Sequence, residues 1–258
     1  MVEPWLINAA TAYNKQSYEQ KEGYVGLILL PLEHLETVLN WSFQSLPDEI
    51  LVGFDPNQNL PHNPEIHEYY IGSDHREQLH QGEGLVVGKP HLVNRGDSFS
   101  VHHIPEEWVD DIFAQDRGGR GSRFTHWLHT HPNAVAIPSG ADADAAQWTS
   151  GVDMILGIQF SPSGPLPWFD EVDGVRRPLR PEDAAQRADD VDSKGRRGWA
   201  RIRRSREERR VLGRANTGHR IHGLELISFH RTGVGINVVL VDNYGIPIGW
   251  NEIKENQL

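Results

Sequence analysis

The sequence contains no cysteine, so disulfide bonds and thiolate metal sites are excluded from this chain. Any zinc that the protein holds must therefore be bound by histidine and carboxylate side chains. The absence of cysteine also fits a protein of the reducing cytoplasm, which is the compartment we expect.

Long apolar runs are missing as well. No stretch approaches the roughly 20 apolar residues that cross a bilayer, so we expect no membrane-spanning segment. The first residues, M-V-E-P-W-L-I-N, lack the basic region and cleavage site of a secretory signal. With 258 residues and 38% hydrophobic content, the chain can still bury a sizeable core, and we expect one domain with an insertion.

Positive charge is scarce and unevenly placed. The net charge of −11 argues against binding of nucleic acid or a membrane surface by the whole molecule. Between Arg176 and Arg214, however, 14 basic residues stand against 7 acidic ones, a local charge of +7. Such a charge run is most often a solvated, partly disordered loop.

The segment from Trp127 to Gln147 contains the most informative pattern, W-L-H-T-H-P followed by S-G-A-D. Bulky and β-branched residues before the proline predict a short strand. On a strand, residues two apart point to the same face, so His129 and His131 should project side by side while Thr130 points away.

After a loop with a second proline, Ser139 begins a helix-like segment with Asp142 in its first turn. This spacing is that of a capping box, in which both side chains serve backbone N–H groups. Two imidazoles and one carboxylate can also make three corners of a tetrahedral zinc site and leave the fourth to water. Asp144 is a rival third ligand, but residues two apart on a helix differ by about 200°, so only one can face the metal.

Together, His129, His131, the proline after it, Ser139 and Asp142 match the signature of the JAMM (MPN+) zinc metalloproteases with no spacing error. The sequence therefore resembles this family, whose spacing selects Asp142 over Asp144. The resemblance implies one zinc ion per chain, held by His129, His131 and Asp142. It also implies hydrolysis of isopeptide or peptide bonds at the C-terminal tail of ubiquitin-like proteins, with the Ser139 hydroxyl stabilising the oxyanion.

The family also carries a glutamate at the start of a strand just after the first helix. Glu49, preceded by Pro-Asp and followed by Gly53, stands in a similar setting, although the glycine is one place later than in the family. A carboxylate near the metal can take a proton from the attacking water and return one to the leaving amine. Glu106 and Glu107 are rivals for this role.

The element order predicts an α/β fold with a mixed sheet flanked by helices, and the resemblance implies a JAMM/MPN-like (cytidine-deaminase-like) domain. We expect a catalytic core over residues 1–161, a charged Arg-rich insertion over 162–218, and C-terminal strands over 219–258 that complete the core. Residues 1–22 show no clear element, and residues 57–84, with four histidines, are interpreted as solvated loop. The expected strands are Tyr24–Leu30, Glu49–Phe54, Gly84–Val93 (a strand or a hairpin), Phe99–His103, Phe124–His131, Met154–Phe160 (beside the histidine strand), Leu224–Phe229 and Gly235–Val241. The expected helices are Pro31–Leu46, Pro105–Gln115, Asp142–Trp148 and Gly198–Leu212.

Other functions stay open. Family members that have lost the zinc ligands act as scaffolds, so a binding module without catalysis is one alternative, and a zinc hydrolase of an unrelated peptide or small amide is another.

Deubiquitinating members carry substrate-contacting insertions at about the position of residues 176–214, so this segment could meet an acidic protein or RNA. An activating protein partner is compatible with either enzyme. His219-x-x-His222 lacks a third ligand and is assigned no metal.

Overall fold

The structure is a computed structural model that describes residues 2–55, 64–76, 86–96, 124–166, 169–179, 182–190 and 210–255. Its helices are α1 (Pro4–Glu19), α2 (Leu32–Ser45), α3 (Pro64–Tyr70), α5 (Gly140–Ala146) and α7 (Trp250–Glu255), and residues 182–190 are helical as well. Its strands are β1 (Gly26–Pro31), β2 (Ile50–Phe54), β3 (Pro90–Arg95), β4 (His126–Pro132), β5 (Val152–Ser161), β6 (Phe169–Val172), β7 (Val175–Pro178), β8 (Gly213–Arg214), β9 (Arg220–His230) and β10 (Ile236–Val241).

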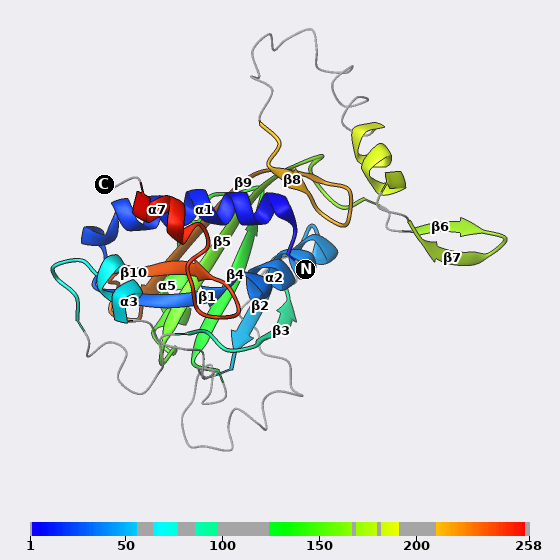
Figure 1. Cartoon of the computed structure of the whole chain (residues 1–258). Helices are drawn as coiled ribbons and strands as arrows, with labels where there is room; N and C mark the ends of the chain where they lie inside the picture. The colour runs from blue at the N-terminus through cyan, green and yellow to red at the C-terminus, as the bar shows by residue number, and fades with distance from the viewer. Residues whose placement is uncertain are drawn as a thin grey trace, which may run out of the picture.

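The architecture is α/β, as expected from the sequence. A six-stranded sheet has the order β3-β2-β4-β5-β9-β8, and β1 pairs with β10 in a small parallel sheet (Figure 1). Within the larger sheet β4 runs parallel to β5, while every other neighbouring pair is antiparallel. The histidine strand β4 is therefore central, with the predicted neighbour β5 beside it.

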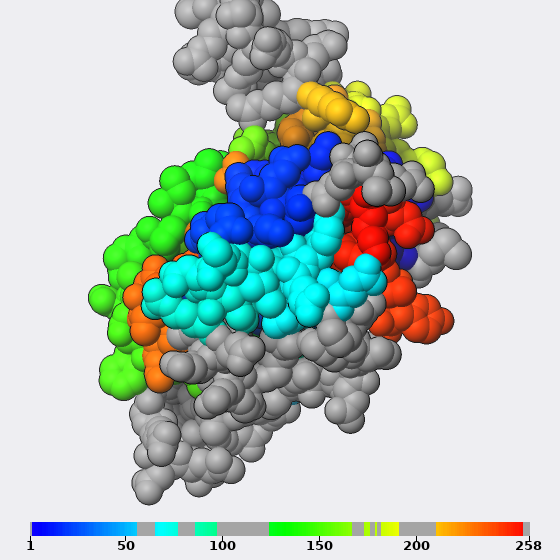
Figure 2. All heavy atoms as spheres, turned by 60° about the vertical axis from the view of Figure 1, so that its left-hand side comes forward, coloured from blue at the N-terminus to red at the C-terminus, as the bar shows by residue number. Residues whose placement is uncertain are grey.

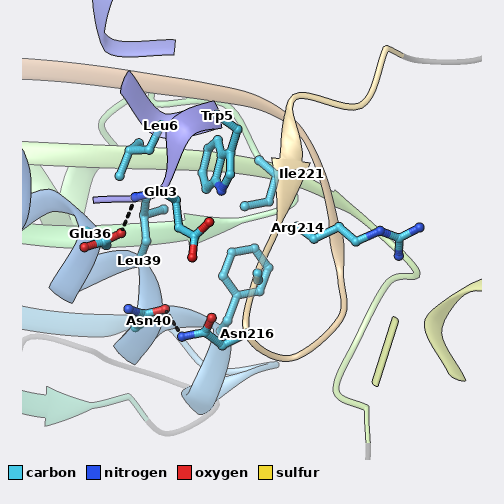
Figure 3. Close-up of a pocket in the computed structure, with 11 residues that line it drawn as sticks. Glu3, Trp5, Leu6, Glu36, Leu39, Asn40, Arg214, Asn216 and Ile221 are labelled. Atoms are coloured by element: carbon cyan, nitrogen blue, oxygen red, sulfur yellow. Dashed lines mark hydrogen bonds between the residues drawn. The ribbon is translucent and has the colours of Figure 1, made fainter. Parts of the chain in front are cut away.

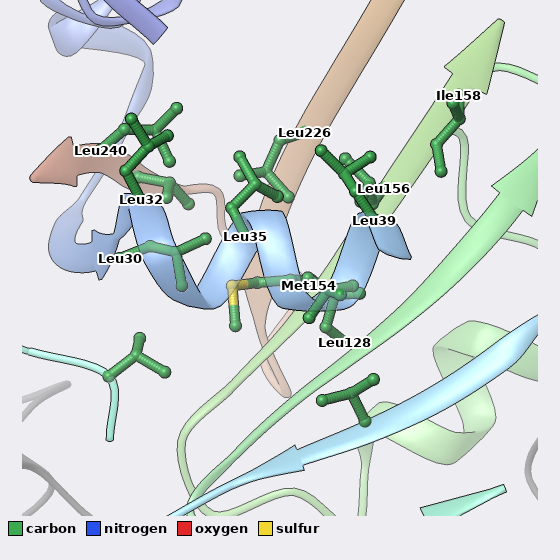
Figure 4. Packing of buried hydrophobic residues seen from close by; sticks show 14 of the residues in the cluster. Leu30, Leu32, Leu35, Leu39, Leu128, Met154, Leu156, Ile158, Leu226 and Leu240 are labelled. Carbon is green, nitrogen blue, oxygen red and sulfur yellow. The ribbon is translucent and has the colours of Figure 1, made fainter. Parts of the chain in front are cut away.

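Helix α2 covers one face of this sheet and forms the main core. Its apolar positions recur every three to four residues, so Leu35 and Leu39 lie on the side that faces the strands (Figure 4). They meet alternate residues of the central strands, Leu128 on β4 and Met154 on β5. Because side chains alternate along a strand, this packing leaves the odd-numbered residues of β4 on the opposite face.

The N-terminal segment forms a helix that the sequence analysis missed. In α1 every third or fourth residue is buried, but two of these residues are the polar Asn14 and Ser17. The side-chain amide of Asn14 donates to the carbonyl of Leu240 at 2.8 Å and accepts its N–H at 2.8 Å, and so continues the hydrogen bonding of β10. A polar side chain that replaces a strand partner lies outside the hydrophobic pattern, which explains the wrong expectation.

The interpretation of residues 57–84 as solvated loop is wrong for residues 64–70, which form α3, whereas the described residues 71–76 lie in no helix or strand. Helix α3 buries Ile66 and Tyr70 almost completely, and the ring of Tyr69 stacks on that of Tyr18 with centroids 4.3 Å apart. Figure 2 shows this segment, coloured cyan, packed against the blue α1.

The other expected elements have three outcomes. Most of the expected elements are confirmed within a few residues, namely those that correspond to β1, α2, β2, β4, α5, β5, β9 and β10. The element predicted at Gly84–Val93 is confirmed from Pro90 onward, where β3 begins. The elements predicted at residues 99–103 and 105–115 and most of the one at 198–212 lie outside the described residues. The division into core and insertion stays a prediction. No helix in the described ranges is long and apolar enough to cross a membrane.

Candidate metal centre

The paired histidines lie on the central strand, on the face that α2 leaves uncovered. His129 pairs with Leu51 of β2 on one side and with Ile155 of β5 on the other. Strands on both sides fix the backbone of β4, and the imidazole of His129 is only 2% exposed. The side chain of His131, nearer the strand end, is 13% exposed. The predicted alternation is confirmed, since both rings lie side by side with centroids 4.9 Å apart.

Asp142 completes a compact group with these histidines. The Nε2 atoms of His129 and His131 are 3.1 Å apart, and Asp142 Oδ1 lies 3.1 Å from Nε2 of His129. The other oxygen, Oδ2, is 3.9 Å from Nε2 of His131. Within the described part of the chain, these residues form the one group of three or more metal-ligand side chains whose donor atoms all lie within 4.8 Å of one another.

This geometry fits a metal ion. Ligands that bind zinc tetrahedrally at about 2.0–2.2 Å lie about 3.3–3.6 Å from one another. Nε2 of His129 lies 3.1 Å both from Nε2 of His131 and from Oδ1 of Asp142, and one ligand atom from each of the three residues lies within 4.8 Å of the others. Two imidazoles and a carboxylate are also a donor set that zinc accepts. The buried group of His129, His131 and Asp142 can therefore bind a metal ion.

The hydrogen bond on the far side of His131 favours its role as a ligand. Its Nδ1 lies 3.0 Å from the carbonyl oxygen of Val135. A carbonyl can only accept, so Nδ1 carries a hydrogen. In the neutral form of such a ring the lone pair is at Nε2, the atom that faces the other two residues. Fixing the ring and its tautomer in this way is what outer-shell partners of metal ligands do.

Asp142 is positioned by a capping box at the start of α5. The N–H of Ser139 donates to Asp142 Oδ2 at 2.5 Å, and the N–H of Asp142 donates to the Ser139 hydroxyl at 3.2 Å. These reciprocal bonds orient the carboxylate toward β4. Asp144, the rival ligand, is exposed and lies outside the group.

Glu49 immediately precedes β2, the strand that pairs with the histidine strand β4. β2 and β4 pair through Leu51 and His129, and continuing this antiparallel register by two residues brings Glu49 opposite His131. Side chains two apart share a face, so the half-buried Glu49 projects on the face that carries both histidines. Its proposed role in proton transfer stays a prediction, and the rivals Glu106 and Glu107 lie outside the described residues.

Thr130 contributes to the site in a way that the sequence analysis did not anticipate. It points away from the histidines, as expected, and is completely buried, where its hydroxyl accepts the N–H of Ile50 at 3.1 Å. This bond ties the residue next to Glu49 to the strand that carries both histidines. No local sequence pattern predicts this hydrogen bond, because it depends on the pairing of segments 80 residues apart.

An apolar floor lies beside the group on the same face of the sheet. Leu51, Phe124 and Trp127 are fully buried there. Gly53 makes this packing possible, since a Cβ at this position would lie 2.4 Å from the ring of Phe124. These apolar side chains lower the local dielectric constant on one side of the group, which strengthens electrostatic interactions within it.

A cavity of about 210 Å³ lies elsewhere in the molecule (Figure 3). It opens between the start of α1, helix α2 and the β8–β9 region, and residues such as Trp5, Glu36 and Arg214 line it. Several lining residues belong to the core on the α2 face, and none of the three metal-group residues contributes to it. The cavity is therefore separate from the metal group.

The two other histidines singled out in the sequence have different partners. The Nε2 atom of the buried His219 lies 2.8 Å from the carbonyl oxygen of Gly164, and burial lowers the pKa of this histidine. The Nε2 atom of His222 lies 2.7 Å from the hydroxyl of Ser161.

No family model matches this sequence, and no curated protein matches it either.

Proposed function

We propose that this protein is a zinc-dependent metalloprotease of the JAMM (MPN+) type, which hydrolyses isopeptide or peptide bonds at the C-terminal tail of ubiquitin-like proteins. The supporting observation is the convergence of His129, His131 and Asp142 in one buried group. His129 and His131 come from the strand β4 and Asp142 from the first turn of the helix α5, in the order that the family signature implies. A mixed sheet with β4 and β5 parallel is compatible with a JAMM/MPN-like domain, which is part of the proposal.

The donor set determines the electrostatics of the proposed site. Two neutral imidazoles and one carboxylate carry a charge of −1, so a bound divalent ion leaves the site with a net charge of +1. A zinc ion supplies Lewis acidity, because it lowers the pKa of water and polarises an amide carbonyl. The small exposed fraction of His129, 2%, limits the screening of this charge by solvent.

Two side chains of the protein carry out the proton transfer and stabilise the oxyanion. Glu49 takes a proton from the attacking water at a carboxylate oxygen and later donates it to the departing amine of lysine. The hydroxyl of Ser139 already accepts the N–H of Asp142, so its own hydrogen stays available for the oxyanion of the tetrahedral intermediate.

Metal content and cleavage together test this proposal. We expect about one zinc ion per chain, lost in His129→Ala, and chelator-sensitive cleavage of ubiquitin-like conjugates. Glu49→Gln should abolish cleavage and retain zinc, because the amide keeps the size of the side chain and cannot accept the proton. Absence of zinc from the unmutated protein would leave His129 and His131 as ordinary strand residues and overturn the proposal.

Zinc without cleavage would contradict the enzymatic part alone. If a panel of ubiquitin-like conjugates stays intact, cleavage should next be measured on unrelated peptides and small amides. Activity on those substrates would favour a different zinc hydrolase, whereas the lack of activity on all of them would favour a scaffold.

A further inference from the structure

Three residues on adjacent strands form a row that begins at His131 of the metal group. His131 on β4 pairs with Gly157 on β5, and Gly157 in turn pairs with Glu225 on β9. Residues that are paired across a sheet project from the same face. Gly157 and Glu225 therefore lie on the face that carries His131, although 68 residues separate them in sequence.

The loop after β4 folds back over this row. It turns at Asn133, whose φ of 55° lies in the left-handed region that asparagine tolerates. The N–H of Asn133 donates to the carbonyl of Ile158 at 2.7 Å, and its side-chain oxygen accepts the N–H of Phe160 at 2.9 Å. These two bonds fix the beginning of the loop to β5.

The loop occupies the space in which a side chain at position 157 would lie. A Cβ on Gly157 would come within 2.8 Å of the nitrogen of Ala136 and 2.9 Å of the carbonyl oxygen of Ala134. Both are main-chain atoms, which cannot turn aside as the end of a flexible side chain can. Glycine at this position therefore allows the loop to lie directly on the sheet.

A single peptide unit of this loop is held at both of its polar ends. The carbonyl of Val135 accepts the Nδ1 hydrogen of His131 at 3.0 Å, and the N–H of Ala136 donates to Oε2 of Glu225 at 3.1 Å. In a trans peptide these two groups point in opposite directions, so the unit connects the carboxylate to the imidazole. Hydrogen bonds in such a chain polarise one another.

From this geometry we propose that Glu225 is a positioning residue for the metal ligand His131, acting through the Val135–Ala136 peptide that rests on Gly157. The carboxylate orients the peptide and strengthens its carbonyl as an acceptor. The carbonyl then fixes the Nδ1–H tautomer of His131 and makes Nε2 a better donor to the metal, as carboxylate–histidine pairs do by direct contact. The inference rests on the metal group of the proposed function and is independent of the substrate.

The affinity for Zn²⁺ tests this role, measured on the full chain by competition with a chromogenic chelator. Glu225→Ala should weaken zinc binding about tenfold, the lower end of the effect expected for an outer-shell partner. Glu225→Gln retains an oxygen that can accept the N–H of Ala136, so it should restore most of the affinity. The absorption spectrum of the Co²⁺-loaded protein should change in Glu225→Ala, because the orientation of one ligand changes.

A pair of glycine variants provides the matched control. Gly157→Ala should displace the loop and weaken zinc binding at least as much as Glu225→Ala does. Gly223→Ala should leave affinity unchanged, because a Cβ at this other sheet glycine would meet Gln159 at an ordinary 3.6 Å. Thermal unfolding of each metal-free variant confirms that it is folded.

The outcomes separate this inference from the proposed function. Unchanged zinc affinity and Co²⁺ spectra in both Glu225→Ala and Gly157→Ala would overturn the positioning role and leave the metal site standing. An equal loss in Gly223→Ala and Gly157→Ala would also overturn it, because the effect would then be a general cost to strand packing. No zinc binding by the unmutated protein would overturn the proposed function itself.

Discussion

Ser139 and Asp142 hold each other in a reciprocal pair of hydrogen bonds, and the pair leaves one oxygen of Asp142 turned toward His129. Oδ2 accepts the N–H of Ser139 at 2.5 Å, while Oδ1 lies 3.1 Å from Nε2 of His129. A helix cap and a metal ligand are alternative interpretations of the S-x-x-D sequence. In the structure the same carboxylate accepts a helix N–H with Oδ2 and faces His129 with Oδ1.

The two functions of Asp142 can be separated by substitution. Asp142→Asn keeps an oxygen for the N–H of Ser139 but removes the charge, so we expect zinc affinity to fall more than about 100-fold, beyond the usual effect of outer-shell changes. The unfolding free energy of the metal-free protein should change by less than about 1 kcal/mol, the scale of a charge at a helix start. Asp144→Asn, on the exposed side of the same helix, is the control and should alter neither quantity. Equal zinc affinities for the two variants would contradict the assignment of Asp142.

The hydroxyl of Ser139 should affect both stability and turnover. Ser139→Ala removes the acceptor for the N–H of Asp142, and we expect the metal-free protein to lose about 1 kcal/mol of unfolding free energy. If the hydroxyl also stabilises the oxyanion, kcat should fall by about 100-fold or more, with zinc affinity nearly unchanged. Ser139→Thr keeps the hydroxyl and should retain most of both properties. A stability loss without any fall in kcat would restrict Ser139 to capping.

Thr130 should control the position of Glu49. Thr130→Val preserves the shape of the side chain but leaves the buried N–H of Ile50 without its acceptor, which costs about 1–3 kcal/mol. We expect the start of β2 to shift, so that kcat falls while zinc binding persists. Thr130→Ser retains the hydroxyl and is the matched control. Denaturant unfolding, zinc titration and kinetics of the two variants check this, and full activity in Thr130→Val would exclude a link between Thr130 and catalysis.

Local patterns predicted the central strands and the metal group, because strand alternation and fixed ligand spacing depend only on residues that are close together in the sequence. They failed for α1, where the buried face includes Asn14 and Ser17 and therefore lacks a clear apolar stripe. They also did not predict the structural roles of Thr130, Gly157 and Glu225. What these residues do depends on strand register and on main-chain contacts of a loop, which join distant segments and leave no periodic pattern in the sequence.

The pH dependence of stability offers a test away from the metal group. Burial lowers the pKa of His34 on α2 to about 4, so between pH 6.5 and pH 4 the unfolded chain binds a proton there that the folded protein does not. The unfolding free energy should therefore fall as the pH is lowered through this window. His34→Gln should reduce the loss between pH 7 and pH 4.5 by about 2 kcal/mol.

This measurement uses urea unfolding with a chelator present, so that release of a metal does not contribute to the slope. Part of the slope should remain in His34→Gln, because burial also lowers the pKa values of His219 and His230. An identical slope in the two proteins would mean that His34 takes up its proton equally in the folded and unfolded states, contrary to the lowering of its pKa by burial.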